Sequence, residues 1–111
     1  MTELEARFES EMVEKVYRTT GRETGYWAAY FLRAVKHDGG VAAAKRLLQK
    51  SGVSRGLAKL GAMNRLDLAM ETLVLAPEYQ ALFTDEERAI ARKRLAQART
   101  VGVAAGEPSV A

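Results

Sequence analysis

Few residues of this chain have types that could carry out a reaction. The single histidine, His37, precedes Asp38, but consecutive residues of a helix point in different directions and do not make an acid–base pair. Near a helix C-terminus such a histidine is a favourable partner of the helix dipole. Ser51 and Ser54 lack a GxSxG context and a second histidine as base, and the chain has no cysteine. The sequence therefore predicts a protein without catalytic residues, metal site or cofactor.

Two acidic residues have the spacing of a shared helical stripe. Asp67 and Glu71 lie four positions apart, which on a helix places both carboxylates on one face. Two carboxylates without a histidine or a third acid nearby make a poor cation site. We therefore interpret Asp67 and Glu71 as a polar helix edge that can dock a partner protein.

Basic residues are concentrated in the middle of the chain, although the net charge is only +3. From residue 39 to residue 66 every charged side chain is positive, and this basic segment contains Lys45, Arg46, Lys50, Arg55, Lys59 and Arg65. Lys45 and Arg46 fall on the helix face opposite Leu47 and Leu48, so they are predicted to face solvent. Such a segment can contact phosphates. The alternative is a solvated face balanced by the acidic first helix, which the modest net charge favours.

The chain is expected to be helical throughout and to form an all-α bundle of about five helices. A first helix over residues 2–18 is indicated by apolar residues that recur every four positions, namely Leu4, Phe8, Met12 and Val16. The segment from Tyr26 to His37 is apolar on almost every side, which predicts a central helix with Trp27, Phe31 or Leu32 deeply buried. One of Tyr26 and Tyr30 can lie at the surface, where a ring stacks on a base or on a partner side chain.

Capping residues indicate where the remaining helices begin and end. Gly39 is suited to stop the central helix, and Ser54 to cap a short helix that carries Leu57 and Leu60. Thr84 and Glu87 have the spacing of a capping box that starts the last helix. Pro77 ends the helix before it.

Residues 1–99 are predicted to form one domain, and residues 100–111 a disordered tail, because the tail lacks periodicity and holds small residues and a proline. The chain has neither a secretory signal pattern nor an apolar run of roughly 18 residues, the length that a membrane-spanning helix needs. Together with the lack of cysteine, this predicts a cytoplasmic protein that does not enter membranes.

Three runs carry a resemblance over about residues 10–97: GYWAAYFLRAVKHDGGVAAAKRLL, SRGLAKL and RLDLAMETLVLAPEYQALFTDEERAIARKRL. They resemble a small bacterial helical module that occurs alone and attached to larger proteins, some of them similar to nucleases or restriction-type enzymes. The typical run of that module is Leu-Asp-Leu-Thr-hydrophobic-Glu, and here Ala69 replaces its threonine. The resemblance implies a partner in nucleic-acid processing but brings no catalytic residue with it.

Two functions of different classes follow from these observations. The first is a non-catalytic interaction domain that docks a protein through Asp67 and Glu71 or through the exposed side of the first helix. The second is a small domain that binds nucleic acid weakly through the basic segment. Convergence of the six basic side chains on one surface would favour the second function. The stripe of the first helix either packs within the chain or completes a homodimer.

Overall fold

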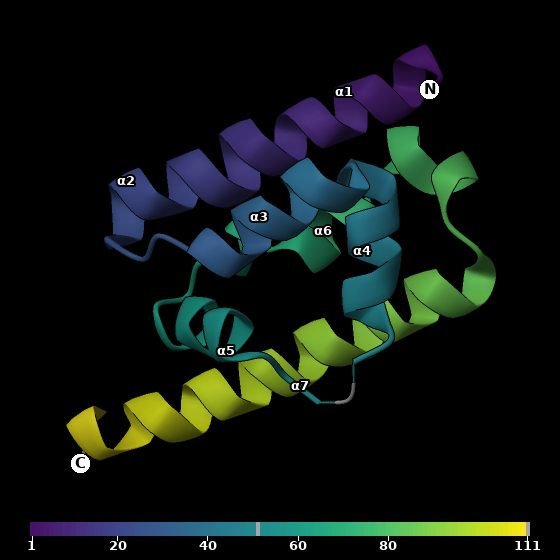
Figure 1. Cartoon of the computed structure of the whole chain (residues 1–111). Helices are drawn as coiled ribbons and strands as arrows, with labels where there is room; N and C mark the ends of the chain where they lie inside the picture. The colour runs from purple at the N-terminus through teal and green to yellow at the C-terminus, as the bar shows by residue number, and fades with distance from the viewer. Residues whose placement is uncertain (51, 111) are drawn as a thin grey trace.

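Every regular element in the described residues of this computed structural model is helical, which confirms the all-α bundle (Figure 1). The structure describes the backbone of residues 1–50 and 52–110, and the side chains of residues 1–50 and 52–100. Two long helical rods, one from each end of the chain, enclose the shorter helices between them (Figure 1). In this described part, no helix is both long enough and apolar enough to cross a membrane.

The N-terminal rod is longer than the periodicity predicted. It consists of α1 (Glu3–Glu11), a π-helical segment η1 (Met12–Thr19) and α2 (Thr20–Thr24), which follow one another without interruption. A capping box between Thr2 and Glu5 starts the rod. It ends at Gly25, whose φ of 77° is the left-handed conformation that favours glycine.

Two short helices then follow one another at an angle, and a third comes after them (Figure 1). Helix α3 (Ala29–Asp38) ends at Gly39, as predicted, and α4 (Gly40–Leu48) begins directly after it. The Ser54 hydroxyl accepts a hydrogen bond from the Leu57 amide at 3.1 Å and so caps α5 (Arg55–Ala62), again as predicted.

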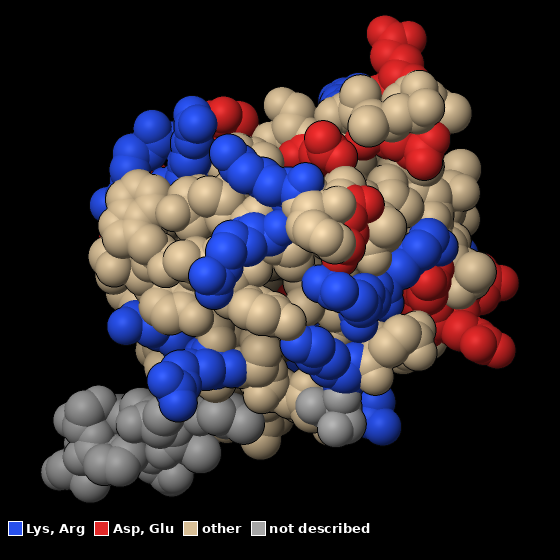
Figure 2. Space-filling model, in the orientation of Figure 1, with Lys and Arg blue, Asp and Glu red and all other residues tan. Residues whose placement is uncertain are grey.

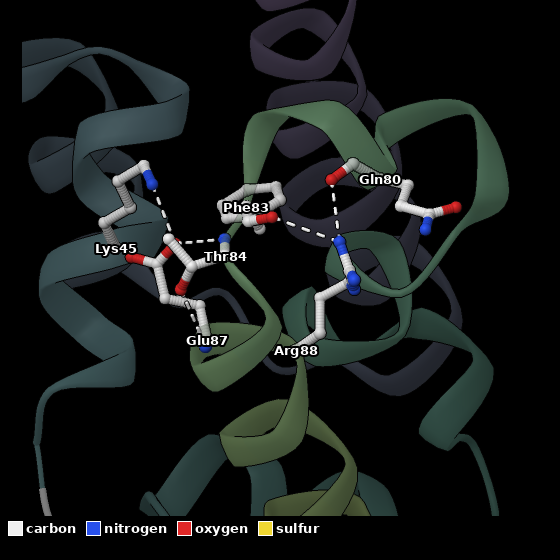
Figure 3. A network of polar contacts seen from close by, with 6 residues as sticks. All are labelled: Lys45, Gln80, Phe83, Thr84, Glu87 and Arg88. Atoms are coloured by element: carbon white, nitrogen blue, oxygen red, sulfur yellow. Dashed lines mark hydrogen bonds and ion pairs between the residues drawn. The ribbon is translucent and has the colours of Figure 1, made fainter.

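The second half of the chain contains two 3₁₀ turns and the long C-terminal helix. The order is η2 (Leu66–Leu68), α6 (Met70–Val74), η3 (Pro77–Leu82) and α7 (Asp85–Val110). The predicted capping box is present: the Thr84 amide donates to the Glu87 carboxylate at 2.8 Å, and the Glu87 amide donates to the Thr84 hydroxyl at 3.1 Å (Figure 3). Arg88 donates to the carbonyls of Gln80 and Phe83, which joins η3 to α7 (Figure 3).

The disordered tail that was predicted for residues 100–111 stays a prediction. Side chains beyond residue 100, and residue 111 altogether, lie outside the described residues.

The main core lies between the N-terminal rod, α4, α6 and the start of α7. Phe8, Met12 and Tyr79 are fully buried there, and the rings of Tyr79 and Phe83 meet that of Phe8 edge-on at 5.1 and 5.2 Å. The Tyr79 hydroxyl donates to the Glu11 carboxylate, and burial together with Glu11 raises the pKa of Tyr79 to about 12. The stripe of the first helix packs within the chain, since Phe8 and Met12 lie in the main core and Leu4 and Val16 pack against it, which is one of the two predicted alternatives. The homodimer itself stays a prediction.

The expected central position of residues 26–37 is wrong. Trp27 is 50% exposed and Tyr30 57% exposed, while Phe31 and Leu32 are only half-buried. Helix α3 lies on the outside of the bundle, and only Ala34 and Val35, in its second half, are buried. An apolar composition on every side indicated burial, but the aromatic half of this segment lines a pocket, and of its rings only that of Phe31 also packs against the main core.

A second, smaller core joins α5 to α7. Leu57 and Leu60 of α5 pack with Ala98 of α7 and with Leu68. The two helices approach so closely at Gly61 that a Cβ atom there would lie 2.4 Å from the carbonyl oxygen of Ala98. Glycine at this position is therefore required for the contact that fixes α5 against α7.

Phe8 should be among the most sensitive positions for stability. Phe8→Ala removes the ring that both Tyr79 and Phe83 contact, so we expect a loss of about 3 to 5 kcal/mol in the free energy of unfolding. Tyr30→Ala is the matched control, because its ring is largely exposed, and it should change stability by less than about 1 kcal/mol. Urea unfolding followed by circular dichroism measures both. Equal losses in the two variants would contradict the assignment of the core.

Candidate ligand-binding site

A pocket of about 400 Å³ opens between α3, α5 and the segment that joins α4 to α5. Its volume lies within the range of about 300–1,000 Å³ that is usual for small-molecule sites. The wall near α3 is aromatic, the rim is cationic, and the floor holds buried polar groups from α2, α6 and α7. These three parts come from segments far apart in the sequence.

The aromatic wall consists of Tyr26, Trp27, Tyr30 and Phe31. The Trp27 ring lies against Gly21, where a Cβ atom would be only 2.2 Å from the indole. The Tyr17 ring meets the Trp27 ring edge-on, with ring centroids 5.5 Å apart. Trp27 is thus held in place by α2 and η1 while half of its surface stays exposed.

Two of the six predicted basic residues lie on the rim, and a third, Lys59, lies over the ring of Tyr26 in the pocket wall. Lys50 and Arg55 line the pocket, and the Lys50 ammonium lies 4.8 Å from the centre of the Tyr30 ring. The Lys59 ammonium lies 5.4 Å from the centre of the Tyr26 ring. Both distances are within the range of cation–π attraction. None of the three side chains makes an ion pair with a described residue.

The other three predicted basic residues are used inside the fold. Lys45 pairs with Glu87 at 2.7 Å (Figure 3), Arg46 with Asp38 at 2.8 Å, and Arg65 with Glu23 at 2.6 Å and with Asp67 at 3.1 Å. The Lys45 side chain is 38% exposed, so it faces solvent in part, as predicted, while its ammonium is held by Glu87. Figure 2 nevertheless shows Lys and Arg spread over the face that α3, α4 and α5 form, with most acidic side chains toward the top and the right of the view.

The floor of the pocket contains a buried ion pair that sequence reasoning missed. Arg94 of α7 and Glu71 of α6 are 7% and 6% exposed, and their nearest atoms, Nη1 and Oε2, are 3.6 Å apart. Arg94 also donates to the carbonyls of Leu47 at 2.8 Å and Leu48 at 3.0 Å, the last turn of α4. Burial raises the pKa of the Glu71 carboxyl, although hydrogen bonding and the Arg94 charge act in the opposite direction.

The polar edge predicted from Asp67 and Glu71 does not form. Asp67 belongs to the 3₁₀ turn η2 and is exposed, whereas Glu71 belongs to α6 and is buried, because the extended backbone at Ala69 separates the two elements. The sequence did contain a signal for the true arrangement. Arg94 falls between Ile90 and Ala98 at spacings of four, which places a charge on an apolar stripe.

A hydroxyl group without a partner completes the floor. Thr20 is 3% exposed and lines the pocket, and its Oγ1 has no hydrogen-bond partner among the described residues. Most buried side-chain polar atoms in proteins are hydrogen-bonded, so this hydroxyl stands out as one that a ligand could satisfy.

Comparison with protein-family models, with curated proteins and with solved structures finds no match to this chain. Among the described residues, no group of three His, Cys, Asp or Glu side chains is placed to hold a metal ion. The arrangement of the pocket is therefore the basis for a functional proposal.

The raised pKa of Glu71 predicts how stability depends on pH. The folded chain keeps the Glu71 proton at pH values where the unfolded chain has lost it, so this contribution is present below the ordinary glutamate pKa and is lost as the pH rises through the raised pKa. Glu71→Gln cannot lose a proton. Its free energy of unfolding should therefore increase relative to the parent as the pH rises from about 4 to about 8.

Urea unfolding at a series of pH values measures this difference. The exposed Glu86→Gln is the matched control for the loss of one carboxylate. A difference between Glu71→Gln and the parent that stays constant, or that falls with pH, would contradict the assignment.

Proposed function

We propose that this chain is a non-catalytic accessory domain that binds single-stranded nucleic acid at the aromatic and cationic opening of the pocket. The observation that carries the proposal is the contact of cations with exposed rings there: Lys50 lies over Tyr30, and Arg55 lines the same opening as Trp27. Sites for single strands combine these two features, since cations follow the phosphates and aromatic rings stack on the bases.

The exposure of the rings favours single strands over duplexes as the ligand. Trp27 and Tyr30 each leave about half of their surface open to solvent, which costs the fold apolar burial. A stacked base contributes about 1 to 3 kcal/mol and would cover such a ring. Bases of a duplex are already stacked on one another and cannot make this contact, so the exposed rings favour an unpaired strand.

Protein docking, the other function that the sequence suggested, has less support. Of the two carboxylates that were to form its polar edge, Glu71 is buried at the pocket floor. The outer side of α1 stays available to a partner protein. An accessory role in a bacterial nucleic-acid-processing or defence system agrees with the resemblance described above and with a strand as ligand, and it forms part of this proposal.

The basic rim can be tested by charge reversal. We expect the parent protein to bind a fluorescent single-stranded oligonucleotide at about 50 mM salt and to lose affinity as salt rises. Lys50→Glu combined with Arg55→Glu should weaken binding at least about tenfold and flatten the slope of log affinity against log salt by about 1.4, for two lost phosphate contacts. Fluorescence anisotropy measures both quantities.

The matched control reverses two charges elsewhere. Arg92→Glu combined with Lys93→Glu changes the net charge equally, but these exposed residues of α7 do not line the pocket. Their reversal should affect affinity much less, because only long-range charge is altered. Absence of binding by the parent at low salt would exclude the proposed function, and equal losses in the two double variants would exclude this surface.

A further inference from the structure

We infer that the pocket beneath this surface receives a single nucleobase, with the attached phosphate held at the cationic rim. The inference rests on the proposed function and deepens it, because it names the part of the strand that enters the fold. Three features of the pocket carry it: the unpartnered hydroxyl at the floor, the flat aromatic wall, and the cations at the opening.

The floor offers the kind of polar groups that read a base edge. The buried Thr20 hydroxyl can both donate and accept a hydrogen bond, and none of the described residues uses it. The Glu71 carboxyl lines the same pocket, 94% buried, and Arg94 lies beside it with a guanidinium that is only partly used. Nucleobases present donors and acceptors side by side on one edge, whereas an acyl chain or a hydrocarbon ligand would leave these groups unsatisfied.

The wall and the rim fit the remainder of the ligand. Trp27 and Phe31 provide ring surfaces on which a flat heterocycle packs. Lys50 and Arg55 line the opening, where a phosphate can stay partly in water while the base is buried. The volume of about 400 Å³ lies near the lower end of the usual range for ligand sites, which suits one nucleoside better than a larger cofactor.

A base with its phosphate can come from two sources, a free nucleotide or a nucleotide within a strand. Titrations with the four ribonucleoside monophosphates test the first source. Titration with an oligonucleotide tests the second source. It is compared with titrations of the same oligonucleotide in which one position, different in each strand, is abasic. The fluorescence of Trp27, the single tryptophan, reports occupation of the pocket directly.

Thr20→Val is the decisive variant. Valine has nearly the shape of threonine and removes a hydroxyl that has no partner within the described structure, so stability should be unchanged or slightly higher. Ligand affinity should fall about tenfold, the effect of one lost hydrogen bond. Thr72→Val is the matched control. The Thr72 hydroxyl donates to the carbonyl of Leu66 at 2.6 Å, so this variant should lose stability and keep its affinity.

The outcomes separate this inference from the proposed function. Saturable quenching of Trp27 by monophosphates or by the intact strand, weakened by Thr20→Val alone, supports the pocket and identifies the source. If the oligonucleotide binds Thr20→Val as tightly as it binds the parent protein, and the abasic strands bind the parent as tightly as the intact strand does, the binding surface is supported and the pocket inference is overturned. If monophosphates bind in the pocket while oligonucleotides do not bind at low salt, the proposed function is wrong and the ligand is a free nucleotide. If neither binds, both are wrong.

Discussion

The arrangement of the site depends on the contacts of the buried Arg94 side chain. This side chain projects from α7, donates to the carbonyls of Leu47 and Leu48 at the end of α4, and pairs with Glu71 of α6. A positive charge at these carbonyls complements the negative end of the α4 dipole. Because a buried guanidinium must keep its partners, the three helices are held in one geometry, and the pocket opens above their meeting point.

The polar groups and exposed rings of the pocket lower the stability of the folded chain. The buried hydroxyl of Thr20 makes no hydrogen bond with the described residues, so it does not stabilise the fold. Burial of Glu71 disfavours the charged form of its carboxyl group. The rings of Trp27 and Tyr30 add a further cost, because half of each could have been buried. The main core around Phe8 and Tyr79 carries the stability that makes these costs tolerable.

The charges of the basic segment divide into two groups with different physical roles. Lys45, Arg46 and Arg65 pair with carboxylates on other elements and hold helices and turns together. Lys50 and Lys59 instead lie over tyrosine rings at the surface, which keeps the ammonium groups open to an anion. For this reason, the number of positive residues in the basic segment overstated its unpaired surface charge. The positive charges that remain unpaired within the described residues of this segment lie beside the aromatic rings.

Local signals in the sequence determined the helical class, the caps at Ser54 and at Thr84 with Glu87, and the stop at Gly39, since each of these depends on residues within one or two turns. Only the tertiary structure decided that residues 26–37 lie outside the core, that Glu71 is buried, and that Lys50 differs from Lys45 in role. Those outcomes depend on which distant helix covers a face. The position of Trp27 depends on the contact of its ring with Gly21. The burial of Glu71 depends on Arg94 of α7, which lies 23 positions later in the chain. Periodicity within one helix states that a face is apolar or charged, but the partner that meets this face is set by long-range packing.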